Sequence, residues 1–174
     1  MVRLFLTNTD ENQSKAAREL LLKVLAQDYN MDSPEILCTE HGKPYIPGGP
    51  CFSISHSRGY VGVAIGDREL GLDLELVRPF PEKLPKRIFS ADEHEWFLER
   101  RETKADFFTL WTLKESYYKY LGTGLPGFPN GTEFYKDKRW HLRDSDLCFS
   151  VMEEKNLLIA LCSDKQIDAK IIWE

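Results

Sequence analysis

The stretch from Leu70 to Leu76 constrains the fold more than any other part of the sequence. Four leucines alternate there with Gly71, Asp73 and Glu75. Side chains on a strand point alternately to opposite faces, so the leucines are expected to be buried and both carboxylates to project from the other face, with Gly71 leaving room beside them. The segment therefore predicts a strand that carries two acids on one face.

A second segment, WTLKESYYK at residues 111–119, has helical spacing. Trp111, Glu115 and Lys119 are four residues apart, so a helix places them along one face. Together with the strand, this gives three carboxylates and one ammonium. Magnesium prefers carboxylate oxygens and takes its remaining ligands from water and substrate phosphates. The two segments predict a magnesium site with a phosphate-binding lysine one helical turn away.

Each pattern also has an ordinary structural interpretation. Acids on the polar face of a strand are usually solvated, and Glu115 with Lys119 is a common helix-surface pair worth about 0.3–0.5 kcal/mol. Trp111 is most simply a core anchor. Lys114 should point about 100° away from Glu115, so it supports either the fold or the phosphates. The functional interpretation gains weight only from the motifs that precede these segments.

Two motifs lie upstream of the strand. GKP at residues 42–44 forms a loop, and FSISHS at residues 52–57 reads as a strand ending in a hydroxyl-rich turn. The ordered set GKP, FSISHS, GLDLE and WTLKESYYK resembles the Sfp-type 4′-phosphopantetheinyl transferases. The segment FSADE at residues 89–93 fits the same family. These motifs run from Gly42 to Lys119 and are specific as a set.

The resemblance implies a fold as well as a chemistry. Each half of the chain supplies a helix followed by antiparallel-looking strands, which indicates the α+β class. The family implies two similar α+β subdomains related by a pseudo-twofold axis, with coenzyme A in the cleft between them. The proline-bearing stretch at residues 78–82 predicts the boundary, giving an N-terminal subdomain at 1–78 and a C-terminal subdomain at 79–174.

The implied reaction transfers the 4′-phosphopantetheine arm of coenzyme A to a serine of an acyl, peptidyl or aryl carrier protein and releases 3′,5′-ADP. By resemblance, Asp73, Glu75 and Glu115 hold the magnesium ion, and Lys119 neutralises pyrophosphate charge. Glu115, directly or through a metal-ordered water, is expected to take the proton of the serine. His56 is an alternative base and is expected more strongly to contact a phosphate.

The nucleotide portion of coenzyme A is expected to contact Arg18, Lys43, Ser55 and His56. Lys43 and His56 match family positions best, whereas the helix of Arg18 aligns only by pattern. Only 41 residues precede Gly42, and family members typically carry a longer amino-terminal region with extra basic residues for the 3′-phosphate. Nucleotide binding is therefore expected to rely on Lys43 and Arg18.

Two other functions would use the same residues. A magnesium-dependent phosphohydrolase needs the three carboxylates but no carrier-docking surface. A non-catalytic coenzyme A binding module needs neither the metal nor the lysine. For the transferase, a basic helix face formed by Lys83, Lys86 and Arg87 beside Leu84 and Ile88 predicts where an acidic carrier protein docks.

Composition limits the remaining classes. A net charge of −5 and a pI near 5.5 argue against a nucleic-acid binder. The four cysteines lack metal-ligand spacing and are expected to be free thiols. No segment has the apolar length of a membrane span or a signal peptide. A cytoplasmic monomer without nucleic-acid or membrane partners is expected.

The hydrophobic pattern also predicts individual elements. A helix should start near Thr9 or Asp10 and bury one stripe, Ser90 and Glu93 should form a capping box for a helix to about residue 100, and Asn130-Gly131 should turn. The stripe comprises Ala17, Leu20, Leu21, Val24 and Leu25. Strands are expected at residues 3–7, 36–39, 51–55, 60–65, 70–77, 133–135, 140–142, 147–153, 157–162 and 167–173, and a long helix at 106–121.

Overall fold

The computed structural model describes residues 1–101, 103–125 and 131–174. The elements follow one another as β1 Val2–Asn8, α1 Gln13–Tyr29, β2 Leu37–Cys38, β3 Pro44–Tyr45, β4 Cys51–Ser57, β5 Tyr60–Gly66, β6 Leu70–Leu76, α2 Pro85–Ile88, α3 Ala91–Glu99, α4 Lys104–Leu121, β7 Phe134–Asp137, β8 Arg139–Leu142, β9 Cys148–Glu154, β10 Leu157–Ser163 and β11 Ala169–Trp173. Helices and strands are mixed along the chain, and the strands pair mainly antiparallel, as the α+β prediction requires.

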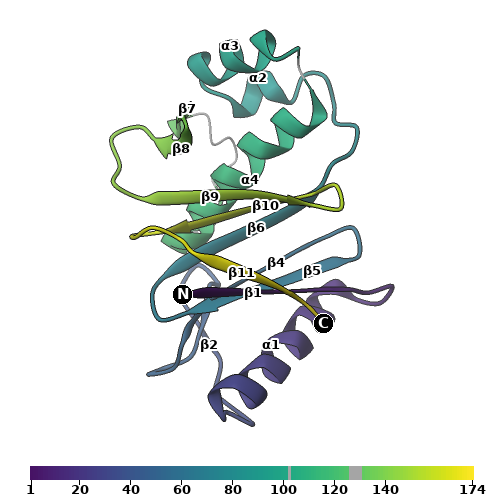
Figure 1. Ribbon diagram of the computed structural model, residues 1–174, viewed down its shortest axis with the longest axis vertical. Helices are drawn as coiled ribbons and strands as arrows, with labels where there is room; N and C mark the ends of the chain where they lie inside the picture. Colours follow the sequence, from purple (N-terminus) through teal and green to yellow (C-terminus); the bar gives the residue numbers. More distant parts are fainter. Residues whose placement is uncertain (102, 126–130) are drawn as a thin grey trace.

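Two sheets form the centre of the molecule (Figure 1). The first has the order β11-β1-β5-β4 and the second the order β6-β10-β9. Each contains one strand that pairs antiparallel with the inner strand of a hairpin, β1 with β5 and β6 with β10. The sequence of strand, helix and hairpin therefore occurs twice, as β1, α1, β4–β5 and as β6, α4, β9–β10. This repeat agrees with the two similar subdomains that the family resemblance implied.

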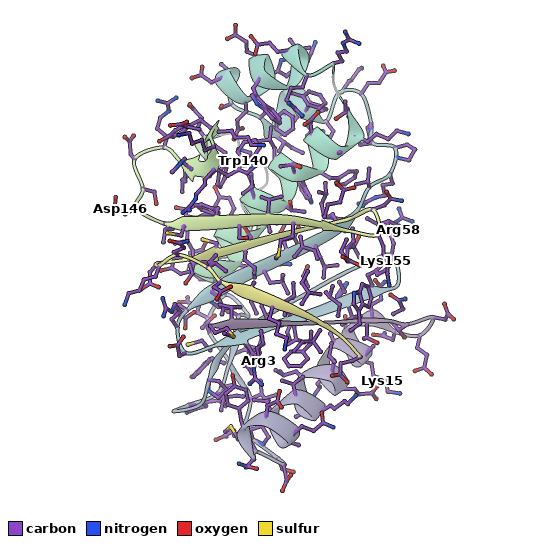
Figure 2. All side chains as sticks on the ribbon, viewed as in Figure 1. Arg3, Lys15, Arg58, Trp140, Asp146 and Lys155 are labelled. Carbon is purple, nitrogen blue, oxygen red and sulfur yellow. The ribbon has the colours of Figure 1, made fainter. Side chains whose placement is uncertain are left out.

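The two hairpins end on the same side of the molecule. Figure 2 shows Arg58, from the turn between β4 and β5, and Lys155, from the turn between β9 and β10, at one end of the sheets. Both residues have positive φ angles, 50° and 52°, as tight hairpin turns require. The equivalent hairpins of the repeat thus share a direction as well as a topology.

Four layers result from this arrangement (Figure 1). The helix α1 packs its buried stripe on the outer face of the first sheet, against Phe52, Val61 and Val63. Leucines of β6 and β10 pack against β1 between the two sheets. The helix α4 covers the other face of the second sheet, where Leu158 joins its core. Each sheet is therefore buried on both faces, and the odd-numbered face of β6 lies under a helix.

Each sheet contains one strand from the other side of the predicted boundary at residue 78. The strand β6 precedes that boundary but pairs with β10, and β11 follows it but pairs in parallel with β1. The boundary itself stays a prediction.

The buried faces of the helices were predicted correctly, whereas the residues at which the helices begin were predicted less well. The buried stripe of α1 is confirmed, but its expected start near Thr9 or Asp10 is wrong. The side chain of Asn12 accepts a hydrogen bond from the Lys15 N–H, which caps the helix at Gln13. The capping box of α3 is confirmed, and α4 begins two residues earlier than expected, capped by Thr103.

Smaller features complete the comparison with the sequence. The expected basic helix around residues 83–88 is present as the short α2, which begins at Pro85, whereas β3 was not predicted. The predicted turn at Asn130-Gly131 extends outside the described residues. All four cysteines are free, as expected. None of the helices in the described part of the chain has both the length and the apolar character needed to cross a bilayer.

Candidate active site at the crossing of β6 and α4

Gly71 marks the point where α4 crosses β6. A Cβ atom at this position would lie 1.9 Å from the Ser116 carbonyl oxygen and 2.5 Å from the Tyr120 nitrogen. Only glycine allows this approach, because both obstacles are backbone atoms. The crossing brings the strand face that carries Asp73 and Glu75 against the helix that carries Glu115 and Lys119. The sequence predicted space beside the carboxylates, and the structure shows that the helix backbone fills it.

Asp73 and Lys119 form an ion pair at this crossing. The Lys119 Nζ lies 2.8 Å from Asp73 Oδ1, and the Ser55 Oγ donates to the same oxygen at 2.9 Å. Lys119 also donates to Ser55 at 2.8 Å, which closes a triangle. Asp73 is only 5% exposed, so it is not the solvated strand acid that the polar pattern suggested. Burial raises the pKa of Asp73, and the charge of Lys119 opposes that rise.

Serine hydroxyls hold the strand of Asp73 in place. The strands β4 and β6 run beside each other without a backbone ladder in the described residues, and side chains of β4 accept hydrogen bonds from β6 amides instead. The three bonds are Leu72 N to Ser53 Oγ at 2.9 Å, Leu74 N to Ser55 Oγ at 3.2 Å and Leu76 N to Ser57 Oγ at 3.5 Å. The alternation of serines in FSISHS, at every second residue, is the sequence signal of this contact between β4 and β6, and it was not predicted.

Glu75 has its own pair of donors. The Ser57 Oγ and the Arg78 Nη1 each lie 2.5 Å from Glu75 Oε2. Arg78 was not singled out in the sequence. A basic residue three positions beyond the second acid of a strand is the signal that would have identified it.

Glu115 is close enough to both strand acids for their charges to affect it. The pKa of Glu115 is raised to about 7, first by burial and then by the charges of Asp73 and Glu75, against the opposing charge of Lys119. Three carboxylates from two elements thus share one region, as the sequence predicted. A divalent cation is the ordinary means of relieving such repulsion.

The donor set fits a hard cation, although its side chains are now bonded to protein groups. In the described part of the chain, no three histidine, cysteine or acidic side chains already stand in a metal-binding arrangement. Instead, Lys119 forms an ion pair with Asp73 and Arg78 forms one with Glu75. The Asp73 Oδ2 is buried without a hydrogen-bond partner, and a buried oxygen of this kind needs a further ligand. The three carboxylates could therefore hold magnesium.

Of the predicted nucleotide contacts, His56 and Arg18 lie apart from this cluster, whereas Ser55 belongs to it. His56 is exposed on the face of β4 opposite Ser55, and its Nε2 lies 3.4 Å from the Ser14 Oγ of α1. Arg18 is also exposed, four residues beyond Ser14 on the same helix. The structure therefore places His56 on the side of the sheet that faces α1. Ser55 is buried and fully engaged beside Asp73.

Lys43 lies at the carboxyl end of α4, next to the turn that carries Lys119. Its Nζ donates to the Tyr120 carbonyl oxygen at 2.9 Å and pairs with Glu69 at 2.6 Å. A cation near the last carbonyls of a helix is favourable. Lys43 thus joins the GKP loop to the carboxyl end of the helix that carries Lys119.

Lys114 supports the fold. It forms an ion pair of 2.8 Å with Glu93, and both side chains are 0% exposed. Glu93 also accepts 2.8 Å hydrogen bonds from the backbone amides of Ser90 and Phe134, and Lys114 donates to the Thr132 carbonyl. Burial raises the pKa of Glu93 and lowers that of Lys114. The FSADE motif therefore fixes α3 and β7 to the helix of the site.

Trp111 packs, partly buried, against the core around α3 and α4. This agrees with its expected role as an anchor. The helical facing derived from the sequence is correct on both sides, because Lys114 points into this core while Lys119 points toward β6.

Comparisons with known proteins show what this chain resembles. A sequence model of the 4′-phosphopantetheinyl transferase superfamily matches residues 69–162. The transferase gsp of Aneurinibacillus migulanus is 33% identical over 120 residues, covering 67% of this chain and 51% of the relative. The transferase Sfp of Bacillus subtilis is 33% identical over 129 residues, covering 71% and 58%. The structure of Thermotoga maritima holo-acyl-carrier-protein synthase aligns with a TM-score of 0.49 at 27% identity, covering 57% of this chain and 64% of that one.

The chain belongs to the 4′-phosphopantetheinyl transferase superfamily. Within it, the relatives named above confirm the resemblance to the Sfp type. The chain spans about half the length of the curated relatives it matches.

Proposed function

We propose that this protein transfers the 4′-phosphopantetheine arm of coenzyme A to a serine of a carrier protein domain and releases 3′,5′-ADP, with magnesium as cofactor. One observation carries the proposal. In a chain of the transferase superfamily, Asp73, Glu75 and Glu115 gather with Lys119 where β6 crosses α4. This is the arrangement that pyrophosphate cleavage needs, because it offers both a cation site and a fixed positive charge.

The reaction forms one bond and breaks one. The serine oxygen attacks the phosphorus that carries the pantetheine arm, the pyrophosphate P–O bond breaks, and 3′,5′-ADP leaves with the electron pair. Lys119 stabilises the charge that builds on the leaving phosphate, since its ammonium is held by Asp73 and Ser55 and its side chain is 31% exposed. Magnesium held by Asp73, Glu75 and Glu115 would neutralise the remaining pyrophosphate charge.

Glu115 is the better candidate to take the serine proton. It belongs to the carboxylate cluster, where its pKa is raised to about 7 in the metal-free protein, and it would take the proton directly or through a metal-ordered water. His56 was the alternative, but it lies on the opposite face of β4 from the carboxylates, beside Ser14. This position favours a role for His56 with Arg18 at the nucleotide end of coenzyme A.

Lys43 and Ser55 take different parts in the proposal from those that the sequence suggested. Ser55 orients Lys119 and Asp73, and Lys43 offers its charge at the carboxyl end of α4. The site is built from one chain and the cysteines are free. These features support a monomer in a reducing, cytoplasmic compartment.

The test is mass analysis of an apo-carrier protein after incubation with coenzyme A, magnesium and this protein. We expect a mass gain of one phosphopantetheine arm, and none when the carrier serine is replaced by alanine or magnesium is chelated. A phosphohydrolase would consume coenzyme A without changing the carrier. A binding module would leave both intact. Either result, obtained with a panel of fatty acid, polyketide and peptide carriers, would overturn the proposal.

A further inference from the structure

Among the described residues of the site, Arg78 is a cation that is held by several contacts but has no part in the reaction above. It follows β6 by two residues, and its Nη1 donates to Glu75 Oε2 at 2.5 Å and to the Leu76 carbonyl at 3.0 Å. Its guanidinium carbon lies 4.6 Å from the ring centroid of Phe108 on α4. Contacts from both the strand and the helix therefore fix the plane of the guanidinium.

The two strand carboxylates each have their own cation. Lys119 pairs with Asp73, and Arg78 pairs with Glu75. Residues two apart on a strand share a face and are separated by about 6.5 Å along it. The ammonium and the guanidinium therefore flank the carboxylates from the two ends of the row. An anion bound over that row would meet a positive charge on either side.

Arg78 also keeps donors for such an anion. Arginine has five N–H groups in a planar fork. Both hydrogen bonds of Arg78 to described residues come from Nη1, which leaves the N–H groups on Nη2 and Nε for a further acceptor. The side chain is 29% exposed, so a ligand can reach it. Phosphate oxygens match this fork geometry and form charge-assisted hydrogen bonds with it.

We propose that Arg78 is a second pyrophosphate-binding residue. In the metal-free protein it holds Glu75, and in the complex with metal and coenzyme A it donates from Nη2 and Nε to a pyrophosphate oxygen. The proposal rests on the proposed function and adds one residue to it. Removing Arg78 should therefore change two affinities in opposite directions. Glu75 is then free to bind a divalent cation more tightly, whereas pyrophosphate binds more weakly.

The experiment uses Arg78→Met, which keeps an apolar side chain against Phe108. Manganese binding is measured by calorimetry without coenzyme A, followed by binding of inorganic pyrophosphate, coenzyme A and 3′-dephospho-coenzyme A at saturating manganese. We expect manganese to bind more tightly, and all three phosphate ligands to bind about tenfold or more weakly, as the loss of a charge-assisted hydrogen bond predicts.

Arg68→Met is the matched control. Arg68 lies just before β6, pairs with the neighbouring Asp67, and its side chain is 30% exposed, nearly the same as that of Arg78. Its replacement removes the same charge from the opposite end of the strand, so we expect no change in any of these affinities. Arg78→Lys is the second variant, in case the methionine variant does not fold. It keeps the charge but not the fork, and we expect weaker pyrophosphate binding without tighter manganese binding.

Two outcomes would overturn the inference. Unchanged manganese and pyrophosphate affinities would leave Arg78 as a structural residue. A loss confined to coenzyme A, with 3′-dephospho-coenzyme A unaffected, would assign Arg78 to the 3′-phosphate. The proposed function is judged separately, by carrier modification with the unaltered protein, so its failure leaves these binding results interpretable.

Discussion

Lys119 and Asp73 form an ion pair of 2.8 Å across the crossing of α4 and β6, although 46 residues separate them in the chain. The Ser55 hydroxyl joins both partners. Because Asp73 is buried, its carboxylate depends on this ammonium in the absence of a metal. The pair therefore connects the predicted metal ligand to the predicted phosphate-binding group and makes the two interdependent.

Lys119→Ala should reduce transfer more than Lys114→Ala does, when rates are expressed per folded molecule. Lys119 points toward the site, and removing a group that stabilises developing charge costs about 10²-fold or more. Lys114 is buried against Glu93, so its loss acts on folding. Turnover at saturating coenzyme A, normalised to the folded fraction from circular dichroism, measures both. Equal losses per folded molecule would mean that Lys119 does not act on the phosphates.

The buried pair of Lys114 and Glu93 gives a prediction on stability. Lys114→Met alone should lower the free energy of unfolding by about 3–5 kcal/mol, because it leaves a buried carboxylate without its cation. Adding Glu93→Gln should restore part of that loss, since glutamine is neutral and its one carbonyl oxygen can still accept from the Ser90 N–H of the capping box, whereas its NH2 group cannot accept from the Phe134 N–H. Urea unfolding of the single and double variants tests this coupling. If the two losses simply add, the ion pair does not hold α3 to α4.

Gly71→Ala tests the close approach of α4 to β6. A methyl group there would overlap the Ser116 carbonyl and the Tyr120 amide, so the helix must move and carry Glu115 and Lys119 away from Asp73. We expect a loss of stability of about 2 kcal/mol or more and loss of transfer. Gly66→Ala is the control, because its Cβ would meet nothing closer than 3.6 Å. Equal effects at the two glycines would refute the proposed role of the crossing.

The sequence predicted that Asp73, Glu75, Glu115 and Lys119 lie close together, but it predicted neither what covers them nor that Arg78 joins them. Alternation placed Asp73 and Glu75 on one face, and the four-residue spacing of Glu115 and Lys119 placed those two on another. Alternation does not reveal what packs on a face, so the burial of Asp73 under α4 could not be predicted. The partner of Lys114 was equally hidden, because Glu93 shows only its local capping role in the sequence.

The contact between β4 and β6 shows a second limit of prediction from sequence. A sequence pattern predicts which segments form strands, but not that side chains will link two of them. Here the hydroxyls of Ser53, Ser55 and Ser57 on β4 accept hydrogen bonds from β6 amides in place of backbone carbonyls. The start of α1 at Gln13 reflects a choice among neighbouring capping residues, Thr9, Asp10 and Asn12, that side-chain geometry decides. Such choices leave no periodic signal.

The stability of the metal-free protein should fall as the pH rises from about 5 to 8. The pKa of Glu115 is raised to about 7 in the folded state, above the ordinary glutamate value of 4.5 that applies to the unfolded chain. The folded protein therefore binds more protons between these values, and deprotonation favours unfolding. For this group the loss should be on the order of 2 kcal/mol.

Urea unfolding in a chelator at several pH values measures this effect. Glu115→Gln is the comparison, because it cannot ionise, and the difference between the two proteins isolates Glu115 from Asp73 and Glu93, whose raised pKa values act in the same direction. Excess magnesium should reduce the pH dependence of the unaltered protein. Parallel stability curves for the two proteins would contradict the assigned position of Glu115 among the carboxylates.

Exposed cations on and just before α2 form the surface that was predicted to dock the carrier protein. The helix α2 exposes Lys86 and Arg87, and Lys83 is exposed just before it. Ile88 was expected to add apolar contact area, but this is wrong, because it is 2% exposed and belongs to the core. Any steering by this surface must therefore come mainly from charge.

Replacing both cations, as Lys86→Glu with Arg87→Glu, should raise the KM for an acidic carrier and make the rate less sensitive to added salt. Coenzyme A binding should not change, because α2 lies beside α3 and away from β6, the strand of the carboxylates (Figure 1). Lys136→Glu with Lys138→Glu, on the exposed hairpin of β7 and β8, makes the same charge change elsewhere. Carrier kinetics at several salt concentrations, with calorimetry for coenzyme A, compare the pairs. If both pairs raise the carrier KM equally, the effect comes from net charge, and docking at α2 is wrong.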